Sequence, residues 1–293
     1  MLYGVNKMKI IAGIVLFNPD LSKLNKSLTI LLGQVDSILL VNNASTNFSE
    51  GCLLIDDKIK IINNKENKGI AYALNQMLDY AANNNYFWLI TLDQDSIPPI
   101  NMISAYNKHM DVPDIGIICP RIYDENQKID SIDVCDGAWV KKPEEVITSG
   151  SCICVAKAIN IGGFDEKLFI DFVDTDFQKR MLDAGCRIYR CDNVVLAHEI
   201  GKITTYSLFG VKVVCTNHNY IRRYYQVRNR LYYKKKYYNR QALWFEMIRL
   251  ILGTIKIVCF EKEKLNKISS TIKGFVDYKK LNDQQILSKW SNN

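Results

Sequence analysis

One stretch decides the fold: Trp88-Leu89-Ile90-Thr91-Leu92-Asp93-Gln94-Asp95-Ser96-Ile97-Pro98-Pro99. The apolar run over residues 87–92 is short, rich in β-forming residues and abruptly ended, which is typical of a buried strand. Asp93 and Asp95 follow at alternate positions of an extended chain, so their carboxylates point roughly the same way. Such oxygen ligands suit a hard divalent cation shared with a phosphate group. Two solvated aspartates in a polar loop are the simpler alternative.

Strand-like and helix-like segments alternate on both sides of this stretch. The predicted strands are 9–16, 38–41, 58–62, 115–119, 152–155 and, last along the chain, 194–197. The predicted helices are 21–32, 70–81 and 175–184. In the first third, the order strand, helix, strand, strand, helix, strand is that of a doubly wound, mainly parallel α/β sheet.

In such a sheet the polar loops that follow the strands gather along one edge. We therefore expect polar residues that are far apart in the sequence to converge there, namely Asn18, Asn42, Asn43, Lys68, Asp93 and Asp95. Short amides and a glycine beside groups that pair with phosphate indicate a nucleotide cleft. The chain contains neither G-x-G-x-x-G nor a Walker loop, which argues against a dinucleotide-binding fold and a P-loop.

The composition is that of a globular protein, with 48% hydrophobic and 24% charged residues in 293. The net charge of +7 is unevenly placed, because residues 219–240 hold eight cations, seven tyrosines and no acidic residue. We expect one domain over residues 1–218 and a helical, basic and aromatic region over 219–293.

Nine cysteines at scattered spacing, without C-x-x-C, suggest neither a zinc site nor a disulfide framework, and a reducing cytosol is the simplest account. The N-terminus has no signal-peptide pattern. No window reaches the roughly 18 uncharged apolar residues of a membrane span. These features predict a cytoplasmic protein.

Three further residues have two interpretations each. Asp174, with Asp176, stands at a helix start, where capping is the ordinary role, although the same position keeps a carboxylate ionised and able to accept a proton. His198 follows the last predicted strand and is either structural or a metal ligand. Trp139 is either a platform for an acceptor or a cover over the core.

Several segments, taken together, resemble glycosyltransferase family 2. They are Val41-Asn42-Asn43-Ala44-Ser45 (V-D-N-x-S in the family), Asn67-Lys68-Gly69 with Asn75 (N-x-G-x(5)-N), Thr91 to Ser96 (the D-x-D strand end), Gly162-Gly163-Phe164-Asp165-Glu166 (G-G-F-D-E) and Asp174-Thr175-Asp176 (E-D-x-D). Asn42 stands where the family usually has Asp, and Val173 where it has Glu. The match runs in order over residues 9–235.

Finer features resemble the rhamnosyltransferase branch: Phe169-Ile170-Asp171, Ala197-His198-Glu199-Ile200-Gly201 and Tyr224-Tyr225-Gln226-Val227-Arg228-Asn229. The resemblance implies an inverting enzyme of GT-A fold that moves a sugar from a nucleoside diphosphate to a hydroxyl. In this branch the donor is typically dTDP-β-L-rhamnose and the acceptor a lipid-linked surface polysaccharide such as O-antigen or capsule.

The resemblance also implies roles for individual residues. Asp174 is the expected general base. Asp95, Asp93 and His198 are the expected ligands of Mg²⁺ or Mn²⁺. Donor binding is assigned to Phe17, Asn18, Asn42, Asn43, Lys68, Gly69, Asn75, Asp93, Gln94, Asp95, Arg228 and Asn229. Weaker acceptor contacts are assigned to Trp139, Ser149, Gly150 and Asp171.

The basic region allows three interpretations. Interleaved tyrosines and cations are compatible with single-stranded nucleic acid, but no recognised nucleic-acid motif accompanies them. A solvated helical surface is the simplest alternative. We favour an interfacial anchor on the anionic inner face of a membrane, because the apolar segment 242–260 follows directly. Nucleic acid is not an expected partner.

Other functions stay open at this point. A nucleotidyltransferase could also carry a metal-binding aspartate pair, but usually has a Gly-rich basic loop after the first strand, where this chain has Phe17-Asn18-Pro19-Asp20. A transferase of the same fold could use a UDP-hexose or UDP-galactofuranose. A non-catalytic basic protein that binds membranes or nucleic acid is the alternative from another class.

Overall fold

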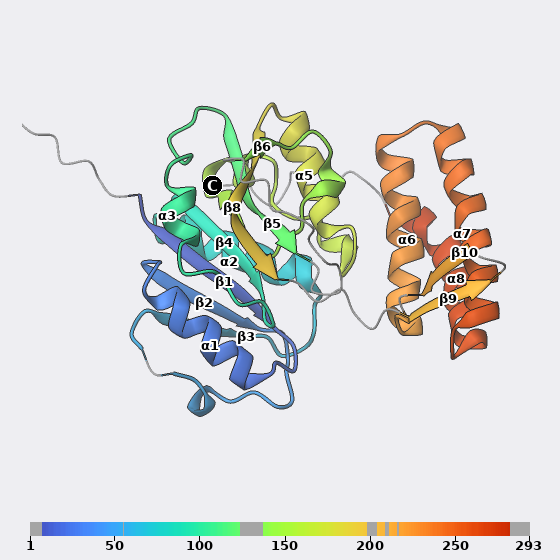
Figure 1. Ribbon diagram of the computed structural model, residues 1–293, viewed down its shortest axis with the longest axis horizontal. Helices are drawn as coiled ribbons and strands as arrows, with labels where there is room; N and C mark the ends of the chain where they lie inside the picture. The colour runs from blue at the N-terminus through green and yellow to red at the C-terminus, as the bar shows by residue number, and fades with distance from the viewer. Residues whose placement is uncertain are drawn as a thin grey trace, which may run out of the picture. The chain divides into compact units, whose positions relative to one another are not determined.

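The chain folds into two compact units (Figure 1). The computed structural model describes residues 8–54, 56–123, 137–197, 204–208, 211–215 and 217–281. Lys167–Val173 and the described residues after 199 form the second unit, whereas the described residues before 167 and those over 174–197 form the first. The division therefore falls before the boundary that the sequence predicted after residue 218, and it assigns one short internal segment to the helical unit.

The first unit is built on a mixed sheet that contains eight of the described strands, in the order β3-β2-β1-β4-β7-β5-β8-β6. β3, β2, β1 and β4 are parallel, as are β5 and β8, while β7 and β6 run antiparallel to their neighbours. The bounds are β1 Ile10–Leu16, β2 Ser37–Asn42, β3 Ile59–Asn63, β4 Trp88–Asp93, β5 Ile115–Tyr123, β6 Ala138–Trp139, β7 Ser151–Cys154 and β8 Arg187–Ala197. The predicted mainly parallel α/β architecture is confirmed.

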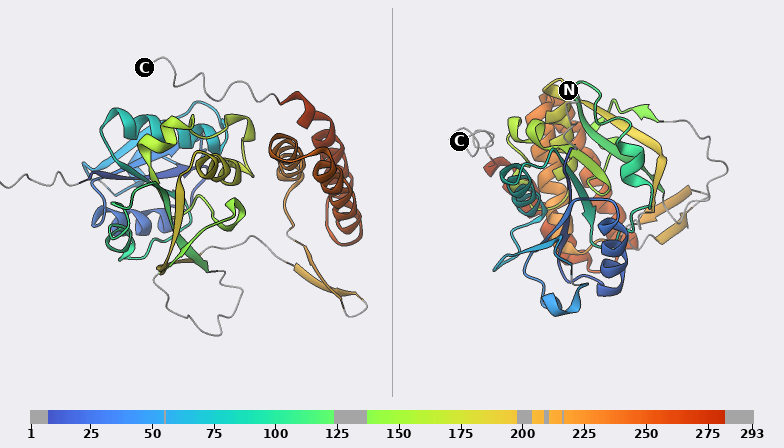
Figure 2. Two further views of the ribbon diagram at one scale, coloured as in Figure 1. Left: turned by 90° about the horizontal axis from the view of Figure 1, so that it is seen from above. Right: turned by 90° about the vertical axis from the view of Figure 1, so that its left-hand side faces the viewer.

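Helices lie on both faces of this sheet (Figure 2, left). Alternate residues of β1 point to opposite faces. Ile10, Ala12, Ile14 and Leu16 join one buried cluster with residues of α1 (Leu21–Leu32) and α3 (Met102–Tyr106). On the other face Gly13 meets α2 (Ile70–Asn83), and a Cβ at this glycine would stand 2.5 Å from Met77 Sδ. A glycine at this position thus lets α2 lie close against β1.

Short elements complete the first unit. α4 spans Val155–Asn160 and α5 spans Val173–Asp183. Single 3₁₀ turns occupy Glu50–Cys52, Pro143–Glu145, Glu166–Leu168 and Tyr278–Lys280, the last of these in the second unit. The eight cysteines among the described residues are free thiols.

Two details of the strands predicted along the chain are wrong. The strand predicted over 152–155 ends at Cys154, and Val155 begins a helix. The strand that ends at Ala197 begins as early as Arg187 and is not the last, because β9 (Thr204–Leu208) and β10 (Val211–Cys215) form a separate antiparallel pair. Both differences arise because short, mixed apolar runs do not distinguish a strand from a helix by pattern alone.

The second unit consists of that hairpin and three helices, α6 (Tyr220–Tyr237), α7 (Arg240–Phe260) and α8 (Lys264–Asp277). Asn219 and Asn239 cap α6 and α7, their side chains accepting hydrogen bonds from the backbone N–H of Arg222 and Ala242. Within the described residues, none of the helices has both the length and the apolar character needed to cross a membrane.

Candidate active site

Polar residues gather at the carboxyl edge of β1–β4, as the sequence predicts. The strand register places Val15 beside Asp93, Leu16 beside Asn42, and Asn42 beside Asn63. Because these four strands are parallel, the loops that follow them open on the same edge. The predicted convergence of strand-end residues is therefore present in the first unit.

Gln94 joins the ends of β1 and β4. Its Oε1 accepts from the Phe17 N–H at 2.8 Å, and its Nε2 donates to the Phe17 carbonyl at 3.1 Å. The Phe17 side chain remains 48% exposed at this edge. The amide of Gln94 is thus engaged by the protein itself, while the aromatic ring of Phe17 is open to a ligand.

Asn18 fixes the loop after β2. It adopts a left-handed backbone conformation, with φ of 51°, which Asn tolerates better than most residues. Its Oδ1 accepts from the backbone N–H and the hydroxyl of Thr46, and its own N–H donates to Ser45 Oγ. These hydrogen bonds therefore hold the loop after β1 next to the loop after β2.

Asn42 and Asn43 direct their side-chain amides to other groups of the protein. Asn42 donates to Asn63 Oδ1 and accepts from the Ser45 N–H. Asn43, 2% exposed, donates to Asn67 Oδ1 and to the Gly69 carbonyl. Both amides thus hold neighbouring loops of the protein in place, and their contact with a donor stays a prediction.

The loop over residues 64–69 leads into α2. Asn43 Oδ1 also accepts from the Lys68 N–H at 3.2 Å, and the Asn67 side chain accepts from the Gly69 N–H. Gly69, at φ of 87°, precedes α2 in a conformation that favours glycine. The Lys68 ammonium is exposed, lying 4.0 Å from Glu66 and 4.8 Å from the ring centroid of Tyr72. Lys68 is thus available at the edge for an anionic ligand.

Ser149 and Gly150 support the turn that contains Asp93 and Asp95, and their contact with an acceptor stays a prediction. Ser149, 1% exposed, accepts from the Asp93 N–H and bonds to the Ser96 hydroxyl. The Gly150 N–H donates to the Thr91 carbonyl at 2.7 Å. Tyr106 donates its hydroxyl proton to the Gly150 carbonyl, and burial raises the pKa of Tyr106 well above its usual value, so that the donor stays protonated.

Asp93 and Asp95 lie where a cation would be expected. Asp93 ends β4 and is half-buried, while Asp95 is exposed. Within the described residues no group of three or more His, Cys, Asp and Glu side chains is arranged to hold a metal ion, and the third expected ligand, His198, lies outside those residues. Mg²⁺ commonly uses only one or two carboxylates and completes its shell with water and substrate phosphates. The pair therefore fits a cation that is shared with a diphosphate.

Asn75 has a structural role, and its assignment to donor binding stays a prediction. It lies in α2 and is 2% exposed. Its Oδ1 accepts from the Phe164 N–H at 2.7 Å, and its Nδ2 donates to the Phe164 carbonyl and to Glu166 Oε1. Asn75 thereby ties the Gly162–Glu166 segment to the helix that starts at the carboxyl edge of the sheet.

The same segment locates Asp174. Phe164 stacks on Phe177 with ring centroids 4.0 Å apart, and Asp174 lies one helical turn before Phe177 in α5. Asp174 is partly exposed, and its Oδ1 accepts from the Thr175 N–H. Asp176, in contrast, is buried and paired with Arg180 at 2.8 Å. Of the two aspartates at this helix start, Asp174 is the one with solvent access.

Asp171, Arg228 and Asn229 all lie in the second unit. There, Arg228 and Asn229 of α6 contact the segment that contains Asp171. Asn229, fully buried, donates to the carbonyls of Leu168, Ile170 and Asp171 at 2.7–2.9 Å. Arg228 donates to Asn229 Oδ1 and to the Lys167 carbonyl. The Asn229 amide therefore has a structural role within this unit, and its contact with a nucleotide stays a prediction.

The segment that Asn229 holds is strained. Phe169, Asp171 and Phe172 have φ of 37°, 63° and 67°, a region that non-glycine residues occupy at a cost of roughly 1–3 kcal/mol each. Asp171 is paired with Arg222, with 3.1 Å between Oδ1 and Nη2. Phe169 stacks on Tyr225, with ring centroids 4.8 Å apart. Helix α6 thus fixes the segment that directly precedes Asp174 in the chain.

Trp139 does not join the site. It lies on the edge strand β6, four strands from β4, which at ~4.8 Å per strand is roughly 19 Å. Its ring is 39% exposed and carries the Arg187 guanidinium 3.4 Å from its centroid. Its ring also meets that of Tyr189, a member of the buried cluster, with centroids 5.1 Å apart, which supports the interpretation as a cover over the core; the acceptor contact stays a prediction.

Sequence reasoning assigned no role to two supporting residues, Arg180 and Asn67, although a local signal could have revealed it. Arg180 follows Asp176 by four positions, the spacing of helical ion pairs. Asn67 precedes Gly69 by two positions, the spacing of a turn closed by an Asn side chain.

Comparisons with known proteins agree with this arrangement. Residues 13–151 match the family model described as Glycosyl transferase family 2. The dTDP-rhamnosyl transferase RfbF of Shigella flexneri is 29% identical over 283 residues, which span 92% of this chain and 94% of RfbF.

Solved structures show the same fold. TarS 1–349 of S. aureus, in complex with UDP, aligns over 95% of this chain and 74% of its own, with a TM-score of 0.52 and 12% identity. GalNAc-T7 with UDP, GalNAc and Mn²⁺ aligns over 71% of this chain and 46% of its own, with a TM-score of 0.52 and 16% identity. The sheet order, the strand-end aspartates and the comparisons agree with one another: residues 13–151 match the glycosyl transferase family 2 model, and the α/β fold is like that of the GT-A structures.

Proposed function

We propose that this glycosyltransferase moves L-rhamnose from dTDP-β-L-rhamnose to a hydroxyl group of a lipid-linked polysaccharide intermediate, with inversion at the anomeric carbon. The observation that carries the proposal is the similarity to a dTDP-rhamnosyl transferase over nearly the whole of both chains. The carboxyl edge of β1–β4, with its exposed Phe17 ring, Lys68 ammonium and Asp95 carboxylate, supports a nucleotide-sugar site in the first unit.

The reaction places opposite charges on two sides of the sugar. The bond from the anomeric carbon to the diphosphate breaks with its electron pair leaving on oxygen, and the sugar becomes oxocarbenium-like. The acceptor oxygen forms the new bond on the opposite face, and its proton must pass to a base. A single displacement of this kind inverts the anomeric centre without a covalent enzyme intermediate.

Asp174 is the proposed base. It is a partly exposed carboxylate in the first turn of α5, where the N-terminal partial positive charge of the helix favours the ionised form. The hydrogen bond from the Thr175 N–H to Oδ1 fixes the orientation of the carboxylate. Asp176 is unsuited to this task because its carboxylate is buried against Arg180.

Asp95 and Asp93 are the proposed ligands of Mg²⁺ or Mn²⁺, with His198 as a further candidate. When bound, the cation would neutralise charge on the leaving diphosphate. Ser149 stabilises the turn that contains both carboxylates. Its hydroxyl oxygen accepts a hydrogen bond from the Asp93 N–H, and its hydroxyl group is hydrogen-bonded to that of Ser96.

A donor-hydrolysis screen tests the sugar nucleotide. dTDP-β-L-rhamnose, UDP-glucose, UDP-galactose and UDP-galactofuranose are incubated with the protein and Mg²⁺ or Mn²⁺, and the released nucleoside diphosphate is measured. We expect turnover of dTDP-rhamnose well above the others. Preferential turnover of a UDP sugar would replace the donor assignment by the alternative donor of the same fold.

Calorimetry separates an enzyme from a non-catalytic basic protein that binds membranes or nucleic acid. An enzyme with the proposed site binds dTDP more tightly in the presence of Mn²⁺, whereas the non-catalytic alternative shows no metal-linked nucleotide binding. Because the acceptor is proposed to be lipid-linked, we place the protein on the cytoplasmic face of an anionic membrane.

A further inference from the structure

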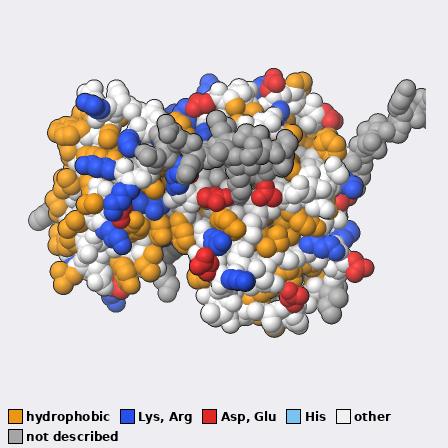
Figure 3. All heavy atoms as spheres, turned by 180° about the vertical axis from the view of Figure 1, so that it is seen from behind, with side chains coloured by type: hydrophobic (Ala, Val, Ile, Leu, Met, Phe, Trp, Pro, Cys, Tyr) orange, Lys and Arg blue, Asp and Glu red, His pale blue; other side chains and the backbone are white. Residues whose placement is uncertain are grey.

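The helices of the second unit are unusually basic and unusually apolar at their surface. From Tyr220 to Lys280 the chain has sixteen Lys and Arg residues against four Asp and Glu residues. Twelve of the seventeen large hydrophobic side chains that are exposed in the described residues also lie in this span. Figure 3 shows hydrophobic and cationic side chains intermingled on the surface of these helices, at the left of the view.

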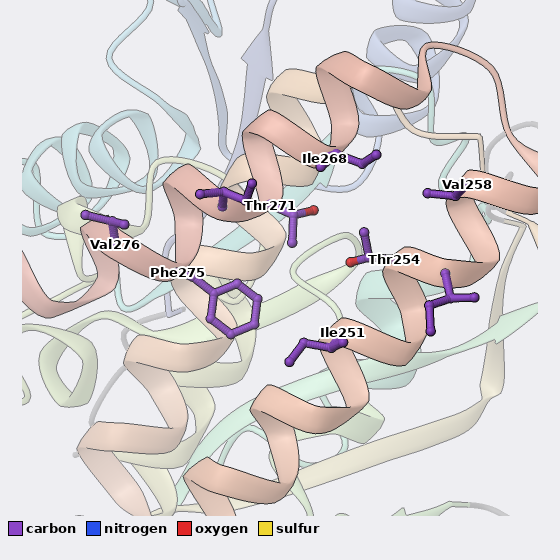
Figure 4. A pocket seen from close by; sticks show the side chains of 9 residues that line it. Ile251, Thr254, Val258, Ile268, Thr271, Phe275 and Val276 are labelled. Atoms are coloured by element: carbon purple, nitrogen blue, oxygen red, sulfur yellow. The ribbon is translucent and has the colours of Figure 1, made fainter.

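An apolar groove of about 480 Å³ runs between α7 and α8 (Figure 4). Ile251, Ile255 and Val258 line it from α7, and Ile272 and Val276 from α8. Each of these five side chains is exposed, by 39–60%. On the helical repeat of α7 the same apolar surface continues through Leu252, 59% exposed.

A basic pocket of about 340 Å³ opens beside this surface. Its lining includes six groups that are or can become cationic and one carboxylate, that of Glu261; the six are His218, Arg223, Arg230, Arg249, Lys256 and Lys267. Glu261 is already paired with Lys267 at 2.8 Å. Leu252 lines this pocket as well, so the apolar surface of α7 reaches its rim.

Arg223 connects the pocket with the groove. Its guanidinium donates to Thr271 Oγ1 at 3.1 Å, to Thr254 Oγ1 at 3.2 Å and to the Leu250 carbonyl. Both threonines line the apolar groove. The hydrogen bonds of Arg223 thus end on uncharged oxygens, and burial lowers the pKa of Arg223 and of Arg230. Arg230 is paired with Glu246, with 3.4 Å between its Nε and Oε1 of the carboxylate. The guanidinium of Arg223, which donates to neutral oxygens, is the partly buried cation that an anion would stabilise.

We propose that the basic pocket binds the phosphate group of an anionic membrane lipid, while the apolar surface of α7 and α8 takes up the lipid chains. The chemistry is that of an interfacial helix whose apolar face enters the acyl region and whose flanking cations meet the headgroups. Arg249 and Lys256 flank the apolar face of α7 at the pocket. The inference rests on the proposed function in one respect only, that the acceptor is lipid-linked.

Charge favours a lipid surface over the other occupants of an apolar face. A second copy of this chain, docked by the same face, would bring two strongly cationic surfaces together in a symmetric contact. A nucleic acid would use the cations but would leave Ile251, Leu252 and Ile255 exposed. An anionic bilayer satisfies both the cationic pocket and the apolar surface.

Vesicle co-sedimentation of the full chain tests the proposal. Vesicles of phosphatidylcholine alone are compared with vesicles of phosphatidylcholine and phosphatidylglycerol. We expect the wild type to bind only the anionic vesicles, and the double variant Arg249→Gln, Lys256→Gln to bind them about tenfold more weakly. Lys235→Gln, which removes an exposed cation of α6 outside the pocket, is the matched control and should bind within about twofold of the wild type.

A second pair of variants tests the apolar surface. Ile255→Ser should weaken vesicle binding at least about threefold, since a large apolar side chain no longer enters the bilayer. Ile100→Ser removes an equally apolar and more exposed side chain from the first unit and should leave binding unchanged. Circular dichroism of each variant confirms that its helices are intact.

Several results would overturn the proposal. The first is that the protein binds neutral and anionic vesicles equally well. The second is that the double variant and Lys235→Gln lose the same amount of vesicle binding. The third is that a single-stranded oligonucleotide displaces the protein from the vesicles. Calorimetric binding of inorganic pyrophosphate without any vesicle binding would show a site for a soluble anion and would reject the lipid. The vesicle assay contains no sugar nucleotide, so failure of the transfer proposal would leave its result unchanged.

Discussion

The carboxyl edge of β1–β4 and the surface of α6–α8 differ in how their side chains are used. At the sheet edge, Asn42, Asn43 and Gln94 direct their amides to other parts of the protein. On α7, large hydrophobic side chains such as Phe245 and Leu252 are more than half exposed. The side chains at the sheet edge are held by hydrogen bonds within the protein. The helical surface instead exposes apolar side chains and cations, which a partner could bury and neutralise. Chemistry is therefore expected at the edge and docking on the helices.

The sharpest way to break this division is Asp174→Asn. The substitution keeps the shape of the side chain but removes the proton acceptor, and loss of a general base typically costs ~10²–10⁴-fold in rate. Transfer should fall by that factor while metal-dependent donor binding persists. Near-normal turnover, measured by release of the nucleoside diphosphate with acceptor present, would refute the assignment of the base.

Asp95→Ala tests the other carboxylate of the edge. Asp95 is exposed, so its removal should leave folding unchanged while the response to added cation is lost and activity falls roughly 10²-fold. A titration of activity with Mn²⁺ measures this response, and Asp111→Ala, at an exposed site away from the strand ends, is the control. A cation response equal to that of the wild type would exclude Asp95 as a ligand.

Asn75→Ala probes how firmly the edge is built. The buried amide makes three hydrogen bonds, two of them to the backbone of Phe164. Leaving buried backbone groups unpaired costs about 1–3 kcal/mol, so the free energy of unfolding should fall by ~2–4 kcal/mol. Urea unfolding measures the loss, and Asn84→Ala, whose amide bonds are at an exposed helix end, should cost far less. A donor-binding defect without loss of stability would restore the ligand role that the sequence predicted.

Asn229→Ala asks whether the helical unit contributes to chemistry after all. Its three hydrogen bonds hold the left-handed residues that precede Asp174. Relaxation of this segment should misplace the base and lower kcat about tenfold, with the KM for the donor little changed. A raised KM at unchanged kcat would instead indicate a direct donor contact. Asn266→Ala, at an exposed position of α8, serves as the control.

Much of the edge was predictable because parallel strands impose it. A short apolar run followed by Asp93 and Asp95 indicates a strand and its end, and the order of elements indicates which loops share an edge. The function of each polar residue there was less predictable. Asn75 and Asn229 fit a pattern associated with ligands, yet both amides are consumed by backbone groups from residues 89 and 58–61 positions away.

The second unit was predictable in composition but not in architecture. The basic and aromatic run from 219 indicates helices and an interfacial role, but the assignment of Lys167–Val173 to this unit depends on long-range hydrogen bonds that no local pattern encodes. The hairpin of β9 and β10 was missed for a related reason, since a two-stranded pair has little apolar periodicity of its own.

The smallest expected effect concerns the pH response of the two regions. His218 lines the basic pocket, and burial together with the nearby Arg222 lowers its pKa from the usual 6.5. The unfolded chain therefore takes up a proton near that pH while the folded chain does not, so stability falls as the pH drops through about 6.5. Thermal unfolding at about pH 7.5 and about pH 5.5 should show a small loss of stability at the lower pH, and His218→Gln should reduce this loss. If His218→Gln keeps the full pH response of the wild type, the sensitivity arises elsewhere and the pocket is not the electrostatically strained site that an anion would relieve.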